Sequence, residues 1–79
     1  MSVKKYNFEL KKYVEYSLPK GAILYSNIDN LYINCANCGK ALNHKDSYTS
    51  LTIHNNFGFG YCICQDCYKQ EIIEKNKYN

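Results

Sequence analysis

The sequence has 79 residues and contains no arginine, one proline and no long apolar run. All ten basic residues are lysines, so the side chain that most often reads guanine in a bidentate manner is missing. No stretch approaches the roughly 20 apolar residues that a membrane-spanning helix needs. The first residues mix polar and apolar side chains and lack the apolar segment of a secretory signal. We therefore expect a cytoplasmic protein in a reducing environment.

Catalytic patterns are also scarce. No nucleophile stands beside a base in any standard arrangement, and the His-x-Glu that precedes the Cys-x-x-Cys of zinc deaminases is absent. His54-Asn55-Asn56 is similar to a segment of the HNH nucleases, but residues 68–77 offer no histidine that could complete such a site. We expect that the chain is not an enzyme.

Cysteine, in contrast, is abundant for so short a chain. We expect one domain over residues 1–79, and a core of this size contributes only about 3–5 kcal/mol unless a disulfide, a metal or a partner stabilises it. Four of the five cysteines form two Cys-x-x-Cys pairs, Cys35/Cys38 and Cys64/Cys67. In a reducing compartment this spacing predicts one metal ion with four sulfur ligands. Four protein ligands leave no open position, so we expect a structural Zn²⁺, with rubredoxin-like iron as the alternative.

Three other side chains are alternative ligands by type. Cys62 lies two residues before Cys64 and could replace it as a ligand, act as a redox-sensitive neighbour or fill space. We favour space filling, because free cysteine is often buried. His44 and His54 lack a second partner at a familiar ligand spacing, so we expect them to be surface or strand residues.

Residues 1–34 are interpreted as an N-terminal extension. Apolar residues at positions 3, 6, 10, 14 and 18 favour a helix over residues 2–18 that ends before Pro19, although tyrosine and valine also alternate there as in strands. Residues 22–25 and 31–33 are strand-like and flank the turn-forming residues 26–30, which predicts a short hairpin.

Residues 35–79 are interpreted as the metal-binding module. Cys35 to Lys40 form a tight turn in which Gly39 supplies a positive φ. Residues 49–54 alternate as in a half-buried strand, residues 55–58 form a turn, and residues 59–64 return as a second strand. We expect Asp66 to cap a helix that reaches about Lys77 and that a Glu71–Lys75 pair supports. The expected fold class is a small zinc-stabilised α+β module.

The order of turn, hairpin and helix, with the last ligand in the first helical turn, resembles the treble-clef zinc finger over residues 35–79. Tyr-Cys-Ile-Cys-Gln-Asp-Cys-Tyr-Lys at residues 61–69 is similar to the second metal half of the Gin-type sigma factor inhibitors of Gram-positive bacteria. That resemblance implies a small regulatory protein that binds a protein partner, and it covers the cysteines and their neighbours. The excess of tyrosine, asparagine and lysine is typical of a low-GC genome, such as that of a Gram-positive bacterium or its phage.

Two kinds of partner remain. The nine tyrosines fit a protein interface, where tyrosine is enriched, and we expect a protein partner first. Nucleic acid is the alternative, because Lys4, Lys5, Lys11 and Lys12 alternate with Tyr6 and Tyr13. The net charge of +3 falls to about +1 once four thiolates hold one Zn²⁺. This small overall charge predicts weak binding to nucleic acid.

Overall fold

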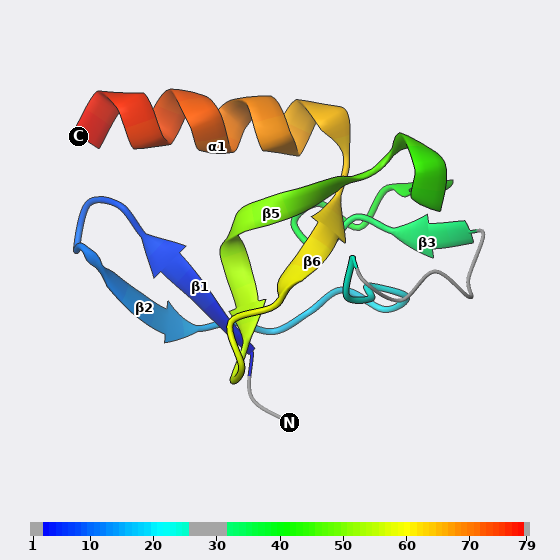
Figure 1. Cartoon of the computed structure of the whole chain (residues 1–79), viewed down its shortest axis with the longest axis horizontal. Coiled ribbons are helices and arrows are strands. Elements are labelled where there is room, and N and C mark those ends of the chain that lie inside the picture. The colour runs from blue at the N-terminus through cyan, green and yellow to red at the C-terminus, as the bar shows by residue number, and fades with distance from the viewer. Residues whose placement is uncertain (1–2, 26–31, 79) are drawn as a thin grey trace.

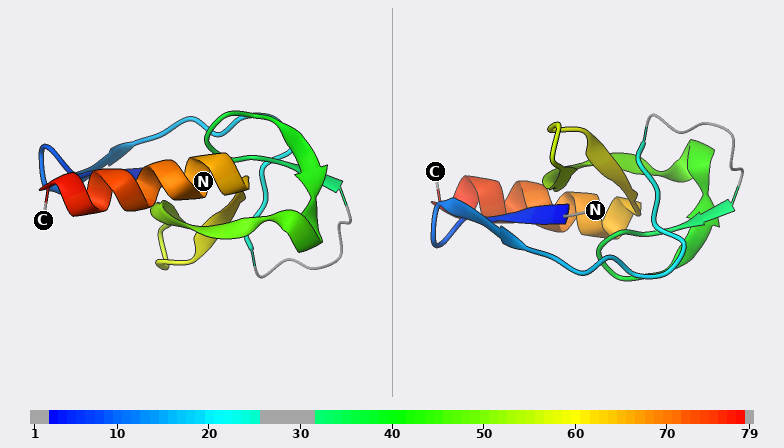
Figure 2. Two further views of the ribbon diagram at one scale, coloured as in Figure 1. Left: turned by 90° about the horizontal axis from the view of Figure 1, so that it is seen from above. Right: turned by 90° about the horizontal axis from the view of Figure 1, so that it is seen from below.

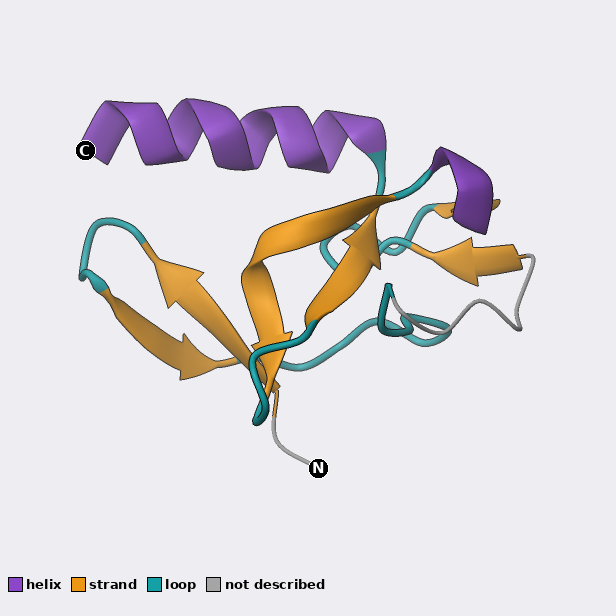
Figure 3. Cartoon of the chain, in the orientation of Figure 1, coloured by secondary structure: helices purple, strands orange, loops and turns teal. Residues whose placement is uncertain are grey.

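The structure, a computed structural model, describes residues 3–25 and 32–78 (Figure 1). Within these residues, six strands, one short 3-10 helix and one α-helix follow one another (Figure 3). In order they are β1 (Val3–Asn7), β2 (Lys12–Glu15), β3 (Tyr32–Asn34), β4 (Ala41–Asn43), η1 (His44–Asp46), β5 (Tyr48–Asn55), β6 (Gly60–Ile63) and α1 (Gln65–Tyr78). The chain is thus α+β, as the sequence predicts.

Two antiparallel sheets organise these strands. The larger has the order β2-β1-β5-β6, and the smaller pairs β3 with β4. Lys5 stands at the junction of three strands, since it pairs with Val14 of β2 and with Ile53 of β5. Helix α1 packs on β5, and its C-terminal half extends over the β1–β2 hairpin (Figures 1 and 2). Residues near the N-terminus therefore share one sheet with the strands that lead to the second cysteine pair.

The predicted helix over residues 2–18 is wrong: residues 3–15 form the β1–β2 hairpin. The turn depends on Asn7, whose Oδ1 accepts a hydrogen bond from the backbone N–H of Leu10 at 2.9 Å, and on Lys11, whose φ is +57°. Leu10, which the helical pattern placed on the apolar face, is 56% exposed. The competing alternation of tyrosine and valine was the correct signal, and pairing of β1 with β5 adds contacts that no local pattern shows.

The predicted hairpin between residues 22–25 and 31–33 is also wrong in its pairing. Its turn and Leu31 lie outside the described residues, but the segments on both sides have other partners. Residues 22–25 form no strand, and Leu24 makes an isolated bridge to Tyr61 of β6, while β3 pairs with β4. Each segment thus pairs with a part of the chain other than its predicted partner.

The β5–β6 hairpin and the helix after it are confirmed. Asn55 closes the turn, because its Oδ1 accepts hydrogen bonds from the backbone N–H groups of Phe57 and Phe59 at 2.9 and 3.0 Å. The burial along β5 differs from its apolar alternation: Ser50 and Thr52 are buried, whereas Leu51 is 38% exposed. A register irregularity between positions 49 and 54 accompanies this inversion.

The face of β5 that carries Ser50 and Thr52 packs against Glu71 of α1, which is also buried. Its carboxylate accepts hydrogen bonds of 2.6 Å from the hydroxyls of Ser50 and Thr52 and from the backbone N–H of Leu51. The expected surface pair of Glu71 with Lys75 is therefore replaced by a buried contact between helix and strand.

The small core surrounds the cysteines. Val3, Ile53, Tyr61 and Ile63 are buried together with Ala36 and three of the paired cysteines. No helix within residues 3–25 and 32–78 is long and apolar enough to cross a membrane.

Candidate metal centre

The first cysteine pair lies in the tight turn between β3 and β4. The backbone N–H of Cys35 donates to the carbonyl of Lys40 at 2.8 Å, and that of Gly39 donates to the carbonyl of Cys35 at 2.9 Å. Gly39 has a φ of +81°, as predicted, which glycine adopts without strain. The backbone N–H groups of Asn37 and Cys38 point at the sulfur of Cys35, at 3.3 and 3.4 Å. The turn thus stabilises negative charge on this sulfur.

The second pair lies where β6 passes into α1. Cys64 directly precedes the helix, and its carbonyl accepts the backbone N–H of Tyr68 at 3.0 Å. Cys67 follows in the first helical turn. Asp66 also lies within that turn, so the prediction that it caps the helix is wrong, although an acidic residue there suits the helix dipole. The helix N-terminus likewise favours thiolate over thiol.

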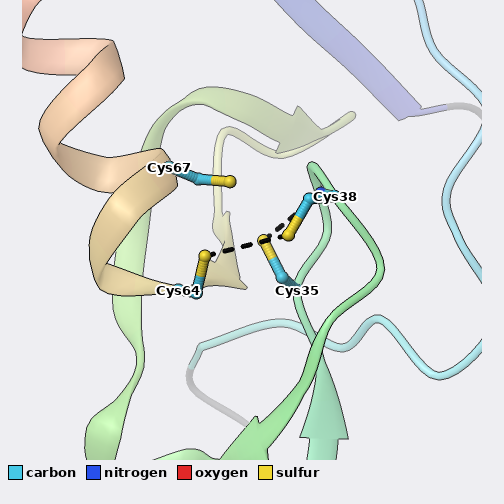
Figure 4. A group of neighbouring side chains, drawn as sticks. All are labelled: Cys35, Cys38, Cys64 and Cys67. Carbon is cyan, nitrogen blue, oxygen red and sulfur yellow. Dashed lines mark hydrogen bonds between the residues drawn. The ribbon is translucent and has the colours of Figure 1, made fainter.

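The four sulfurs converge. Figure 4 shows those of Cys35 and Cys38 facing those of Cys64 and Cys67 across a small space. All four lie within 4.8 Å of one another, and Cys38 Sγ is 3.8 Å from Cys64 Sγ. Sulfurs about 2.3 Å from a central zinc ion stand about 3.8 Å apart in a tetrahedron. These cysteines are therefore positioned to bind one metal ion.

The electrostatics of the group also suit a cation. Burial raises the pKa of Cys35, but hydrogen bonds from backbone N–H groups, chiefly that of Cys38, outweigh burial and bring it down to about 7. Burial raises the pKa of Cys38 and of Cys67. Four thiolates in so small a space repel one another, so full ionisation needs a positive charge among them. A divalent ion supplies that charge, and thiolate ligands favour Zn²⁺ or iron.

Exposure differs among the four cysteines. Cys35, Cys64 and Cys67 are buried, whereas Cys38 is exposed. The exposed cysteine gives a metal ion a route into the site from solvent, while the buried ones keep bulk water from most of the shell.

The alternative ligands lie elsewhere. Cys62 is fully buried in β6 and outside the sulfur group, which fits the space-filling interpretation. Although it lies two residues before Cys64, β6 ends between them at Ile63, so the alternation of a regular strand no longer applies. His44 Nε2 lies 2.9 Å from the carbonyl oxygen of Tyr25. His54 Nδ1 lies 3.3 Å from the hydroxyl of Tyr13.

Tyr16 ties the N-terminal hairpin to the metal turn, a role that the sequence did not indicate. Its hydroxyl donates to the carbonyl of Ala36 at 2.7 Å, between the two cysteines of the turn. Burial, followed by the charges of the nearby cysteines, raises the pKa of Tyr16 and keeps this donor protonated. Lys5 Nζ lies 5.3 Å from the centre of the Tyr16 ring and donates to Asn37 Oδ1 at 2.8 Å. The metal turn is thus held from outside as well as by its own backbone.

No family model, curated protein or solved structure matches this chain.

Proposed function

We propose that this chain is a zinc-stabilised binding module and not an enzyme. The main support is the group of four cysteine sulfurs. In it, Cys38 Sγ and Cys64 Sγ are 3.8 Å apart, which is about the edge length of a zinc–sulfur tetrahedron. Four sulfurs fill a tetrahedral shell and leave no position for a reactive water or a substrate. Such closed sites are structural. The zinc ion therefore holds the fold together, and the activity of the protein is binding.

The path of the chain supports a treble-clef arrangement for this module. A tight Cys-x-x-Cys turn is followed by the β5–β6 hairpin and then by a helix whose first turn carries Cys67. The resemblance to Gin-type sigma factor inhibitors adds a regulatory protein partner, which stays a prediction. We prefer zinc to iron because zinc is redox-inactive and a closed, structural site needs no redox chemistry.

Native mass spectrometry of protein purified without oxygen tests the proposal. We expect one zinc ion per chain, lost on replacement of Cys64→Ser or Cys67→Ser. The matched control is Cys62→Ser, which removes a buried thiol outside the sulfur group and should retain zinc. Loss of zinc from the Cys62 variant together with retention in the Cys64 variant would show that the ligand set is wrong.

A further inference from the structure

The β1–β2 hairpin and the adjoining end of β5 carry a row of aromatic rings. Tyr6 and Tyr13 stand directly across from each other on β1 and β2, with ring centres 5.2 Å apart. Phe8 extends the row at 5.2 Å from Tyr6, and His54 of β5 extends it on the other side at 5.8 Å from Tyr13. We call these four rings the aromatic face.

The aromatic face is accessible. Tyr13 is 49% exposed, and the other three rings are half-buried. Cross-strand packing accounts for the contacts between the rings, but a hairpin does not need four of them in one open row. A row of this kind can stack about two or three unpaired bases in other sheet proteins.

Grooves border the row at both ends. One of about 360 Å³ lies between β1 and the last turns of α1, and its lining includes Tyr6, Phe8, Lys77 and Tyr78 as well as Glu9 and Glu74. A second of about 310 Å³ shares Tyr6, Phe8 and Tyr78 and adds Lys11 and Lys75. A third of about 250 Å³ lies at the other end of the row and is lined by Lys4, Tyr13 and His54.

The charge of the protein is concentrated at this end. Residues 3–15 and 74–78, which we call the hairpin end, hold six of the ten lysines and three glutamates, so the local formal charge is +3. The rest of the chain has four lysines and four acidic residues and is neutral. Four thiolates around a divalent ion would add a charge of −2 there. The small overall charge expected from composition thus conceals a positive end and a negative end.

From the aromatic face, the grooves and the charge, we infer that the hairpin end binds single-stranded nucleic acid. Lysines contact phosphates while aromatic rings stack on bases, and this combination is the common design of single-strand binders. Bases in a duplex are already stacked on one another, so a duplex could use only the lysines. The absence of arginine removes the strongest sequence-reading contact, and binding should therefore tolerate many sequences. The inference rests on the proposed function, since it identifies the partner of the binding module as nucleic acid in place of the protein that the resemblance implies.

Fluorescence anisotropy of the zinc-loaded protein with labelled random-sequence oligonucleotides tests the inference. The probes are single-stranded DNA and RNA of about twelve nucleotides, within the site size of stacking platforms, and a DNA duplex of equal length. We expect tighter binding to the single strands by about tenfold or more, because stacking on even one base contributes on that order. Equal affinity for the duplex would overturn the inference.

Matched variants separate the aromatic face from the rest of the surface. Tyr13→Ala should weaken single-strand binding by about tenfold. Tyr32→Ala removes another exposed tyrosine, 81% accessible and on β3 near the metal turn, and should change nothing. Equal losses in the two variants would contradict the assignment to the aromatic face.

A second pair of variants tests the charge. Replacing Lys11, Lys75 and Lys77 with glutamine should lower the salt slope of single-strand binding by about 2, at about 0.7 per phosphate contact. Replacing Lys40, Lys45 and Lys69 removes the same charge from the rest of the molecule and should leave the slope unchanged. The zinc content of each sample is also measured. A sample that lacks zinc counts against the proposed function and not against this inference. Folded, zinc-loaded protein that binds no oligonucleotide would refute the inference and leave a protein as the partner.

Discussion

The region around Cys35, Cys38, Cys64 and Cys67, which we call the cysteine end, and the hairpin end differ in how far their side chains are exposed. Three of the four paired cysteines are buried, and backbone N–H groups point at the sulfur of Cys35. At the hairpin end the aromatic rings are at least partly exposed and five of the six lysines are exposed, whereas Lys5 is half-buried and donates a hydrogen bond to Asn37 in the metal turn. In the proposed function, zinc binding stabilises the cysteine end, and the hairpin end is then free to expose a surface that contributes little to stability.

Removal of zinc should have the largest effect. Structural zinc contributes about 10–16 kcal/mol in small zinc fingers, more than the roughly 3–5 kcal/mol surplus of a core of this size. We expect a chelator to abolish the dispersed amide signals in the NMR spectrum, including those of the hairpin end. A spectrum that stays dispersed after the metal is gone would show that the two ends are stable without it.

The buried Glu71 should have the next largest effect. Glu71→Ala leaves two hydroxyls and one backbone N–H without their acceptor, and we expect the free energy of unfolding to fall by about 3 kcal/mol. The control is Glu74→Ala, an exposed position on the same helix, which should change it by less than about 0.5 kcal/mol. Urea denaturation of the zinc-loaded variants measures both values. Similar losses in the two variants would mean that the buried contact is not what holds α1 on β5.

Tyr16 links the two ends and should have a smaller effect. Tyr16→Phe removes the hydrogen bond to the Ala36 carbonyl but keeps the ring, and we expect a loss of about 1 kcal/mol in the free energy of unfolding. Tyr32→Phe removes an exposed hydroxyl as the control. A zinc competition titration should also show weaker metal affinity for the Tyr16 variant. An unchanged affinity would mean that the hairpin does not support the metal turn.

The aromatic face should matter least for stability. Tyr13→Ala removes a ring that is 49% exposed, and cross-strand pairs of this kind contribute about 0.2–1 kcal/mol. Thermal unfolding followed by circular dichroism should therefore differ little from that of the unmodified protein. A large loss of stability would indicate that the ring serves the fold, and the contrast between the two ends would disappear.

The metal centre was predictable from the sequence because ligand spacing is a local property. Two Cys-x-x-Cys pairs specify the turn and the start of α1, and Gly39 supplies the φ that the turn requires. The β5–β6 hairpin was predictable for the same reason, since residues 55–58 are strong turn formers.

The N-terminal half was not predictable, because its structure depends on distant partners. A helical spacing and a strand alternation coexist in residues 3–18, and only pairing with β5 decides between them.

Two features of the second half also depend on distant partners. The alternation along β5 predicts that Ser50 and Thr52 face solvent, but their hydrogen bonds to Glu71 of α1 place them inside. The concentration of charge at the hairpin end likewise needs the fold, because Lys75 and Lys77 are distant in sequence from Lys11.

X-ray absorption at the zinc edge tests the central claim most directly. A structural centre made of Cys35, Cys38, Cys64 and Cys67 predicts four sulfur scatterers at about 2.3 Å and no nitrogen or oxygen in the first shell. A shell that contains nitrogen or oxygen would mean that a histidine, a carboxylate or water binds the metal. A histidine or carboxylate would show that the ligand set is wrong, whereas a bound water would leave an open position for chemistry and end the separation between a stabilising end and a binding end.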